Sequence, residues 1–572
     1  MEIKRYSKPQ LILIIIILFF MVVQELAGML HNSVVWDELC FVGAGKAIFS
    51  TGYMNYMLLA DHPPLSYYLN SIPLIPLKFD EKIWQNNSCW KIGHEVLFKS
   101  SYSTGRLLFI SRMPFIFLSI LLAFFVLKWS TEIYGAKSGV FALFLYSFNP
   151  SIIAYSGIAT ADFTVAAMIF ITAYYFWKLI KNHSKKNLLL AGIFFGLAQL
   201  SKITAIILIP MFMAMGFVAL YSRQNKLKLK DLIKDFFAIM LIGFFLVLAF
   251  HKFQFGTIAG SLPPEYYTER AREEIGKIPT VSKYLVFVYD KIPLPAPVYI
   301  GMVGNIFYLS LQEKAGFVFG RITSEIVWYF PLLTFFLKTS LSLLIMLVIT
   351  LILHKKLPKK DFLTNMSLLA PIILIFIIFS KTNKFAGVNH ILAVYPFIFI
   401  LASNLINIKI KNKKVLVTAL LLSYAMPVLL IAPYYLSYVN LLAGGPGNAY
   451  KIIVGANIDQ GQELLELKKF ISERGISNIK LSYWGSVDPK DYNISYEYMP
   501  SPYFQPWQNN YTHIAPSPRN ISEDCSKRSG LIAISVTNLQ NAHLINKTCY
   551  DWLKNQKPIE KAGYSMFIYD IK

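Results

Sequence analysis

Long hydrophobic stretches recur along most of the sequence and constrain its fold more than any other feature. A helix that crosses a bilayer needs about 20 predominantly apolar residues, and such stretches recur between residues 11 and 433. We expect eleven spans, near residues 11–30, 107–127, 138–157, 163–180, 188–200, 204–221, 235–253, 325–353, 366–381, 390–408 and 415–433. The chain of 572 residues is 55% hydrophobic and 15% charged, too apolar for a water-soluble protein. The sequence predicts an α-helical polytopic membrane protein.

The basic residues orient these spans. Lys4, Arg5 and Lys8 precede the first span, and basic clusters follow at 178–186, 223–234, 354–360 and 409–414. With eleven spans, every cluster falls on one side, which the positive-inside rule makes cytoplasmic. We therefore expect a multi-pass protein of the plasma membrane with a cytoplasmic N-terminus. The net charge of +23 then reflects topology and contact with anionic lipid, and no nucleic-acid partner is expected.

This topology divides the chain into a transmembrane domain, residues 1–433, and a soluble extracytoplasmic domain, residues 434–572. The first contains two outer loops, 31–105 and 251–324, and part of the earlier loop has an amphipathic pattern that suits a membrane surface. In the second, "GQELLELKKFISERG" predicts a helix. The runs "IKLSYW", "NISYEYM", "LIAISV" and "SMFIYDI" predict strands. We expect a small α/β fold there.

All four cysteines fall in segments expected on the outer side, where disulfides persist. We predict the pairs Cys40–Cys89 and Cys525–Cys549, and the alternative is four free thiols.

Two acidic positions in the first outer loop are candidates for chemistry. Asp37 and Glu38 follow the first span directly, and a carboxylate there can act as a general base or a hard-metal ligand. In "DHPP", two prolines stiffen the backbone beside Asp61 and His62. A solvated acidic cap and a structural Pro-Pro turn are the simpler interpretations.

Other ionisable residues lie at the expected outer boundary of the membrane. Asp162 opens the fourth span, as a functional group at membrane depth or as a helix N-cap. His251, at the outer end of the seventh span, could bind a metal or be merely solvated. Cations that the positive-inside rule leaves unexplained suit a lipid-linked phosphate, although snorkelling would also account for them; they are Arg106, Arg112, Lys202, Lys338, Lys381 and Lys384.

Several familiar motifs are missing from the sequence. There is no P-loop, no dinucleotide-binding GxGxxG, no CxxC zinc pattern and no GxSxG elbow. ATP-driven transport, redox chemistry and serine hydrolysis are therefore disfavoured.

The order of the remaining motifs resembles the lipid-carrier-dependent glycosyltransferases, a GT-C family that includes the protein O-mannosyltransferases and the aminoarabinose transferases. The matching segments run along nearly the whole chain: "WDE", "DHPPL", "TADF", "GLAQLSKITA", "WYFPLLTFFLKTS", "YYLSYVNLLAGGPGNAY" and "NIDQGQELLELKKF". The sequence departs from the family at Gln460, where Trp is usual, at Ser340 and Ala393, where Pro is usual, and at Asn389, where Arg is expected.

The resemblance implies transfer of a sugar, mannose or another hexose, from a polyprenyl or dolichyl phosphate to a hydroxyl of a protein or glycan. Asp37, Glu38 and Asp162 would be catalytic, and Asp61 and His62 would help to hold the carrier phosphate, with the cations above. The expected course is a single, inverting displacement. A divalent metal ion is a possible cofactor, with Asp37, Asp61 and His251 as candidate ligands, and no nucleotide is needed.

The alternative from a different class is a transporter or flippase for a lipid-linked glycan, which broken helices and intramembrane charge would also suit. The exported tail and the paired acids of the first outer loop favour the transferase. A receptor anchored by many spans has no support in the sequence.

Overall fold

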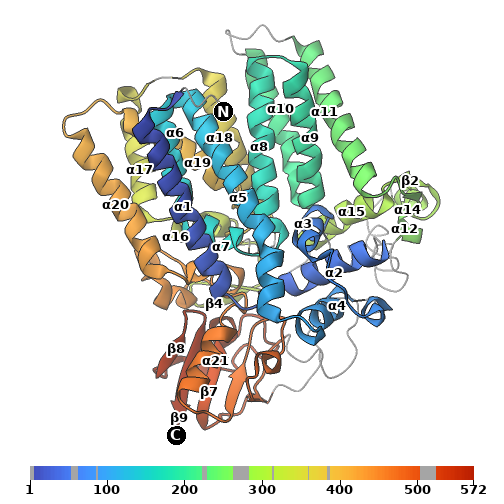
Figure 1. Cartoon of the computed structure of the whole chain (residues 1–572), viewed down its shortest axis with the longest axis vertical. Helices are drawn as coiled ribbons and strands as arrows, with labels where there is room; N and C mark the ends of the chain where they lie inside the picture. The colour runs from blue at the N-terminus through green and yellow to red at the C-terminus, as the bar shows by residue number, and fades with distance from the viewer. Residues whose placement is uncertain are drawn as a thin grey trace.

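The computed structural model describes residues 5–52, 62–85, 88–221, 228–261, 282–311, 315–358, 360–382, 385, 387–502 and 524–572. Asp61 and Lys384 lie outside these residues. The described chain forms a bundle of long helices with a β-sheet at one end, and α1 (Lys8–His31) starts at the opposite end (Figure 1).

Seven helical segments of the described chain are long and apolar enough to cross a membrane. They are α1, α5 (Thr104–Tyr134), α8 (Ala161–Lys181), η6 with α10 (Ile203–Ile207 and Leu208–Tyr221), α11 (Leu229–Phe250), α18 (Phe362–Ser380) and α20 (Lys413–Ile431). Two helix pairs also qualify, each with a sharp bend: α6 (Ala136–Ser147) with α7 (Pro150–Ser156) by 64°, and α16 (Phe330–Lys338) with α17 (Leu341–Ile352) by 108°. The chain is a multi-pass α-helical membrane protein.

The remaining two expected spans coincide with shorter helices, α9 (Lys185–Ser201) and α19 (Val394–Ser403). By length and composition the described chain thus has seven spans, or nine with the bent pairs, and eleven remains a prediction. The bundle is held by a continuous apolar core in which α8 is almost wholly buried.

The start of α8 and the end of α9 fix two polar side chains within this core. Asp162 lies in the first turn of α8, where a carboxylate is stabilised by the helix dipole, and Lys178 and Lys181 lie in its last turn. Helix α9 ends at Ser201 because Lys202 has an extended backbone (φ −161°, ψ 141°), and the chain then continues into η6. Lys202 therefore occupies a break between two helices, as the sequence predicts.

The first outer loop folds into short helices at the end of the bundle that carries the sheet (Figure 1). They are α2 (Glu38–Thr51), α3 (Leu65–Ser71), η3 (Ile72–Leu74), η4 (Glu81–Gln85), α4 (Cys89–His94) and η5 (Glu95–Lys99). The predicted disulfide Cys40–Cys89 is confirmed and joins α2 to α4. The second predicted disulfide, Cys525–Cys549, is confirmed as well.

The described part of the second outer loop contains short helices and two small hairpins. The helices are α12 (Ile258–Ser261), α14 (Ser282–Lys291) and α15 (Pro297–Leu311). Strand β1 (Phe255–Gly256) pairs with β2 (Leu294–Pro295), and β3 (Gly316–Val318) pairs with β4 (Arg321–Thr323), both antiparallel.

The C-terminal part builds a mixed five-stranded sheet in the order β6-β5-β7-β9-β8. Strand β5 is parallel to β6 and β7, and the pairs β7–β9 and β8–β9 are antiparallel. The strands are β5 (Ile479–Ser482), β6 (Tyr496–Tyr498), β7 (Gly530–Ser535), β8 (Glu560–Ala562) and β9 (Met566–Ile571). Four of them overlap the strand-like runs of the sequence, whereas β8, "EKA", has no apolar pattern.

Helix α21 (Leu464–Glu473) lies beside this sheet and buries Leu464, Leu467 and Phe470, which share one face. The remaining short elements are η7 (His354–Lys356), η8 (Asn404–Asn407), η9 (Tyr435–Ser437), η10 (Leu441–Ala443), η11 (Pro446–Lys451), η12 (Gly455–Asn457), η13 (Pro489–Tyr492), α22 (Val536–Leu539) and α23 (Asp551–Lys554).

Candidate active site

Asp37 is the residue directly before α2, and the backbone of its neighbour Trp36 is hydrogen-bonded to Gln460, which precedes the C-terminal sheet in the chain. The side chain of Asp37 is exposed. Desolvation by the surrounding protein and the negative charge of Asp162 together raise its pKa to about 6, and the positive charge of Lys202 acts in the opposite direction. A reachable carboxylate with a pKa near neutrality has the properties of a general base.

A buried ion pair, Asp162 with Lys202, acts on the carboxylate of Asp37 through its charges. The ammonium of Lys202 donates to Asp162 over 2.6 Å, and both side chains are more than nine-tenths buried. The amide of Asn389 donates to the second carboxylate oxygen of Asp162 over 3.4 Å. Lys202 thus supplies a positive charge close to two carboxylates, those of Asp162 and Asp37.

Three further side chains lie close enough to interact with these carboxylates through their charge or dipole. His62 and His390 both act on Asp162, and Tyr155 lies near Asp162 and Asp37. Tyr155 receives a hydrogen bond from Gln460 over 2.7 Å and donates one to the carbonyl of Ala456 over 3.0 Å. Gln460, one of the departures from the family pattern, therefore sits at the edge of the site.

The sequence alone did not indicate Tyr155 or His390 as residues of the site. Both belong to segments whose apolar character made them part of expected spans, and a single polar residue in such a run carries no pattern of its own. The sharp bend between α6 and α7 is what turns Tyr155 towards Asp37 and Asp162.

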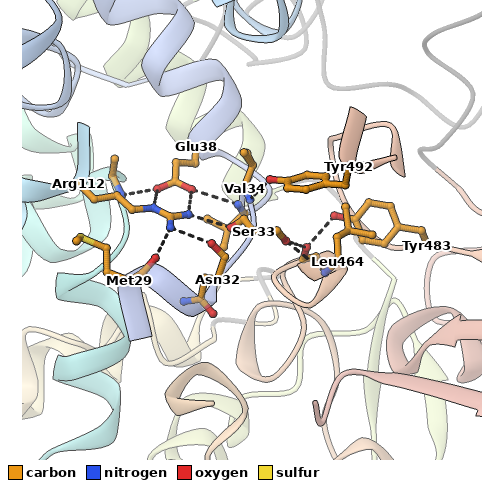
Figure 2. Close-up of polar contacts among 12 residues, drawn as sticks. Met29, Asn32, Ser33, Val34, Glu38, Arg112, Leu464, Tyr483 and Tyr492 are labelled. Carbon is orange, nitrogen blue, oxygen red and sulfur yellow. Dashed lines mark hydrogen bonds and ion pairs between the residues drawn. The ribbon is translucent and has the colours of Figure 1, made fainter. Parts of the chain in front are cut away.

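Glu38 and Arg112 bind each other (Figure 2). Arg112 donates Nε and one terminal nitrogen to the two carboxylate oxygens of Glu38, over 2.7 and 2.6 Å. Its terminal nitrogens also donate to the carbonyls of Met29, Asn32 and Ser33. This guanidinium thus has all five N–H groups engaged and none left for a phosphate.

The carboxylate of Glu38 is equally occupied. Besides Arg112, it accepts hydrogen bonds from the backbone N–H groups of Val35, over 3.2 Å, and Ala159, over 3.0 Å. Glu38 is fully buried, although the adjacent Asp37 is exposed. Together, Glu38 and Arg112 fix the backbone on both sides of Asp37. A catalytic role for Glu38 and a phosphate-binding role for Arg112 remain predictions, and these contacts give both residues a structural role.

The other predicted cations are dispersed. Arg106 is exposed near the start of α5. Lys338 is buried and donates to the carbonyls of Leu436 and Asn457, over 2.7 and 2.6 Å, so it ties α16 to the segment that follows α20. Lys381 lies at the end of α18. Among the described cations that were expected to bind the carrier phosphate, Lys202 contacts a carboxylate of the candidate site, that of Asp162.

The candidate metal ligands do not form a metal site in the described part of the chain, where no three His, Cys, Asp or Glu side chains cluster as metal ligands do. His251 donates Nδ1–H to the carbonyl of Val247 over 2.8 Å and packs against the ring of Tyr299. Asp61 lies outside the described residues, and a metal requirement remains a prediction.

The segment "NIDQGQE" joins the loop of Asp37 to the C-terminal sheet. The backbone N–H groups of Trp36 and Ser33 donate to the carbonyls of Gln460 and Gln462, each over 3.0 Å. Asp459 accepts hydrogen bonds from the backbone and hydroxyl of Thr537. This segment is therefore hydrogen-bonded to the active-site loop on one side and to the sheet region on the other.

Aromatic stacking reinforces the junction. The ring of Trp36 stacks on Trp484 with centroids 5.1 Å apart, and Trp484 stacks on His543 at 4.5 Å. Burial lowers the pKa of His543 to about 4, so this imidazole is neutral at pH 7. The residue next to Asp37 is thus the first of three stacked rings, two of them from the C-terminal part of the chain.

The fold and site define a multi-pass membrane protein with a carboxylate and a buried ion pair at one end of its bundle. The family model for dolichyl-phosphate-mannose-protein mannosyltransferases matches residues 103–251, from α5 to α11. This match includes Asp162 and Lys202, and it confirms the resemblance to lipid-carrier-dependent glycosyltransferases over that segment. None of the curated proteins matches the chain.

Solved structures of three such enzymes are similar in arrangement at low sequence identity. ArnT from Cupriavidus metallidurans, bound to undecaprenyl phosphate, is 11% identical, with a TM-score of 0.46 over 98% of this chain and 97% of that one. The Archaeoglobus fulgidus oligosaccharyltransferase is 14% identical, with a TM-score of 0.43 over 77% and 57%.

The third structure is the S. cerevisiae protein O-mannosyltransferase Pmt1–Pmt2 complex bound to the sugar donor. It is 22% identical, with a TM-score of 0.33 over 43% of this chain and 34% of that one. All three scores lie below 0.5, and the family model is the stronger of the two observations. It supports a glycosyltransferase that uses a lipid-linked donor.

Proposed function

We propose that this protein transfers a hexose, with mannose the best supported, from a polyprenyl or dolichyl phosphate to a hydroxyl group of a protein or glycan. The observation that carries the proposal is the exposed Asp37, with a pKa of about 6, beside the buried Asp162–Lys202 pair. The reaction would occur at the end of the bundle that bears the C-terminal sheet, on the extracytoplasmic side of the plasma membrane.

In this mechanism Asp37 is the general base. It accepts the proton of the acceptor hydroxyl as the hydroxyl oxygen forms a bond to the anomeric carbon of the sugar. The bond from that carbon to the phosphate oxygen breaks at the same time, and its electron pair leaves with the carrier phosphate. Attack and departure on opposite faces of the carbon make a single displacement that inverts the anomeric configuration.

Lys202 would stabilise the negative charge that develops on the leaving phosphate. One of its three N–H groups is held by Asp162, which orients the ammonium, and two remain for the phosphate. An ammonium fixed in advance needs little reorganisation during the reaction. Asn389 would hold Asp162 in turn.

A transfer assay tests the proposal. The full chain in nanodiscs is supplied with polyprenyl-phosphate mannose and a mixed pool of Ser/Thr peptides and glycans, with and without EDTA. We expect label on an acceptor with wild type and none with Asp37→Asn, whereas Asp570→Asn, which neutralises an exposed aspartate at the end of β9, should behave as wild type.

Two results would overturn the proposal. Equal transfer by Asp37→Asn and wild type would remove Asp37 as the base. Movement of the carrier across the bilayer, with no label on any acceptor, would identify a flippase instead.

A further inference from the structure

A recess in the first outer loop has a volume of about 530 Å³. It is formed by η4, α4, η5 and the adjoining turns, and none of the candidate active-site residues lines it. Four lysines line its wall, Lys78, Lys82, Lys91 and Lys99, against two acids, Asp80 and Glu95. We call this recess the lysine pocket.

The four lysines of the pocket exceed the two acids that line it, Asp80 and Glu95, and leave an excess of positive charge. Within the described part of the chain, Lys78, Lys82 and Lys91 form no ion pair, and Lys99 reaches Asp491 at 3.6 Å. One carboxylate oxygen of Asp80 accepts the backbone N–H of Lys82 over 2.9 Å. An excess of positive charge around one hollow attracts an anion into it.

The wall of the pocket is built before any ligand arrives. Phe79 forms part of it and packs against Trp84 with ring centroids 6.3 Å apart. The ammonium of Lys46, from α2, lies over the ring of Phe79 at 5.3 Å. The Cys40–Cys89 disulfide fixes α4, which carries Lys91, against α2.

The residues that precede the pocket point to a membrane surface. Ile72 and Ile75 are about half exposed, at 51% and 50%, a few residues before Lys78. Exposed aliphatic side chains followed by lysines are typical of a segment that contacts the headgroup layer of an anionic membrane. A phosphate group is the anion that such a surface presents.

We propose that the lysine pocket binds a phosphate group, supplied by an anionic phospholipid headgroup or as free phosphate. Four flexible ammonium groups can each donate to one of several phosphate oxygens as point charges. Ser100 and Ser101 at the rim provide additional hydroxyl donors. Such a ligand would bind independently of the sugar donor, because the pocket shares no residue with the site of Asp37.

Calorimetric titration of the detergent-solubilised full chain tests this proposal. The titrants are dihexanoyl phosphatidic acid and inorganic phosphate. We expect saturable binding of one equivalent to wild type and at least tenfold weaker binding to Lys82→Ala/Lys91→Ala. The matched control Lys527→Ala/Lys557→Ala removes two exposed lysines outside the pocket and should bind within twofold of wild type.

Thermal unfolding of each variant establishes that it is folded, and Lys82→Gln/Lys91→Gln repeats the test with longer neutral side chains. Asp37→Asn should bind as wild type does, which separates this site from the proposed catalytic one. Binding of both titrants, lost in the pocket variants, would show that phosphate alone is sufficient. Binding of phosphatidic acid alone, lost in the same variants, would identify the lipid headgroup.

The proposal fails if neither titrant binds saturably. It also fails if the pocket variants and the control variant lose affinity equally, because the attraction would then come from the net charge of the protein.

Discussion

Lys202 and Asp162 face each other at 2.6 Å in a region where both side chains are buried. They come from different segments of the chain. Asp162 lies in the first turn of α8, and Lys202 lies in the break that follows α9. A buried carboxylate without this partner would be costly to ionise. With it, the structure places a fixed cation and an accessible carboxylate, that of Asp37, close to each other.

Replacing Asp37 tests the base directly. Asp37→Asn should lower the rate of sugar transfer at least 10²-fold, which is the lower end of the effect of a general base. Carrier binding and thermal stability should stay close to wild type, because the side chain is exposed. Single-turnover transfer, measured with saturating donor, separates the two effects. A loss of donor binding with an unchanged rate of the bound complex would contradict the assignment.

The rate of transfer should depend on pH through Asp37. A base must be ionised, so the rate of wild type should rise with pH through about 6, the pKa of this carboxyl. Asp162→Asn removes a negative charge that raises this pKa and leaves Lys202, which lowers it. The midpoint of the surviving activity should therefore move to lower pH. A midpoint that moves upward, or that stays unchanged, would show that Asp162 does not act on the base.

The Glu38–Arg112 pair should contribute to stability and not to donor binding. Removing one partner of a buried ion pair leaves an uncompensated charge, so Arg112→Ala and Glu38→Gln should each lower the free energy of unfolding by about 3–5 kcal/mol. Arg112→Lys should not restore it, because one ammonium cannot replace five N–H donors. Denaturant unfolding in detergent measures both effects.

Arg106→Ala is the matched control on the same helix. Its side chain is exposed, so the change in unfolding free energy should stay within about 0.5 kcal/mol. If Arg112→Ala kept wild-type stability but bound the donor more weakly, the result would support a role for Arg112 in binding the carrier phosphate.

The stack of Trp36, Trp484 and His543 should position Asp37 from a distance. Trp484→Ala removes the ring that covers Trp36, and we expect a lower kcat with little change in the KM of the donor. Trp484→Phe keeps a flat apolar ring and should recover part of the rate. Steady-state transfer by the three proteins at one pH provides the comparison. Equal rates for all three would show that the stack does not position the base.

Glu463 should make stability depend on pH. Burial raises its pKa from 4.5 to about 7, in spite of hydrogen bonds from the backbone of Tyr564 and from the backbone and hydroxyl of Ser565. The folded state then holds the proton more tightly than the unfolded state. The resulting stabilisation is complete below about pH 4.5 and is lost as the pH rises through about 7.

The comparison protein is Glu463→Gln, which cannot titrate at this position. The Tm of wild type minus that of Glu463→Gln should decrease steadily between pH 4.5 and 7. A difference that is constant over this range would contradict the raised pKa.

Much of the helical architecture could be predicted from hydropathy alone. Each expected span coincides with one helix or one bent pair, because apolar length is a local property of the sequence. The bends within the two bent helix pairs, in contrast, are not evident from the local hydropathy. Residues 325–353 form one apolar run, yet α16 and α17 meet at 108°, with Lys338 held by the carbonyls of Leu436 and Asn457.

In the candidate site, too, single residues could be predicted from the sequence, whereas their spatial arrangement could not. Asp37, Asp162 and Lys202 could be selected one by one, because each is an ionisable residue at a membrane boundary. Their grouping, and the pairing of Glu38 with Arg112 across 74 residues, depend on helix packing that no motif records. A charge at a boundary looks the same in sequence whether it faces a ligand or a neighbouring side chain.

The hydrogen bond from the hydroxyl of Ser33 to the carbonyl of Gly461 spans 428 residues of chain. Ribosomes make Asp37 early, but the backbone partners of its loop, Gln460 and Gln462, emerge only after most of the helices. A nascent chain would therefore carry Asp37 through membrane insertion before the partners of its loop exist. The order of synthesis completes the candidate site only when the bundle is nearly whole.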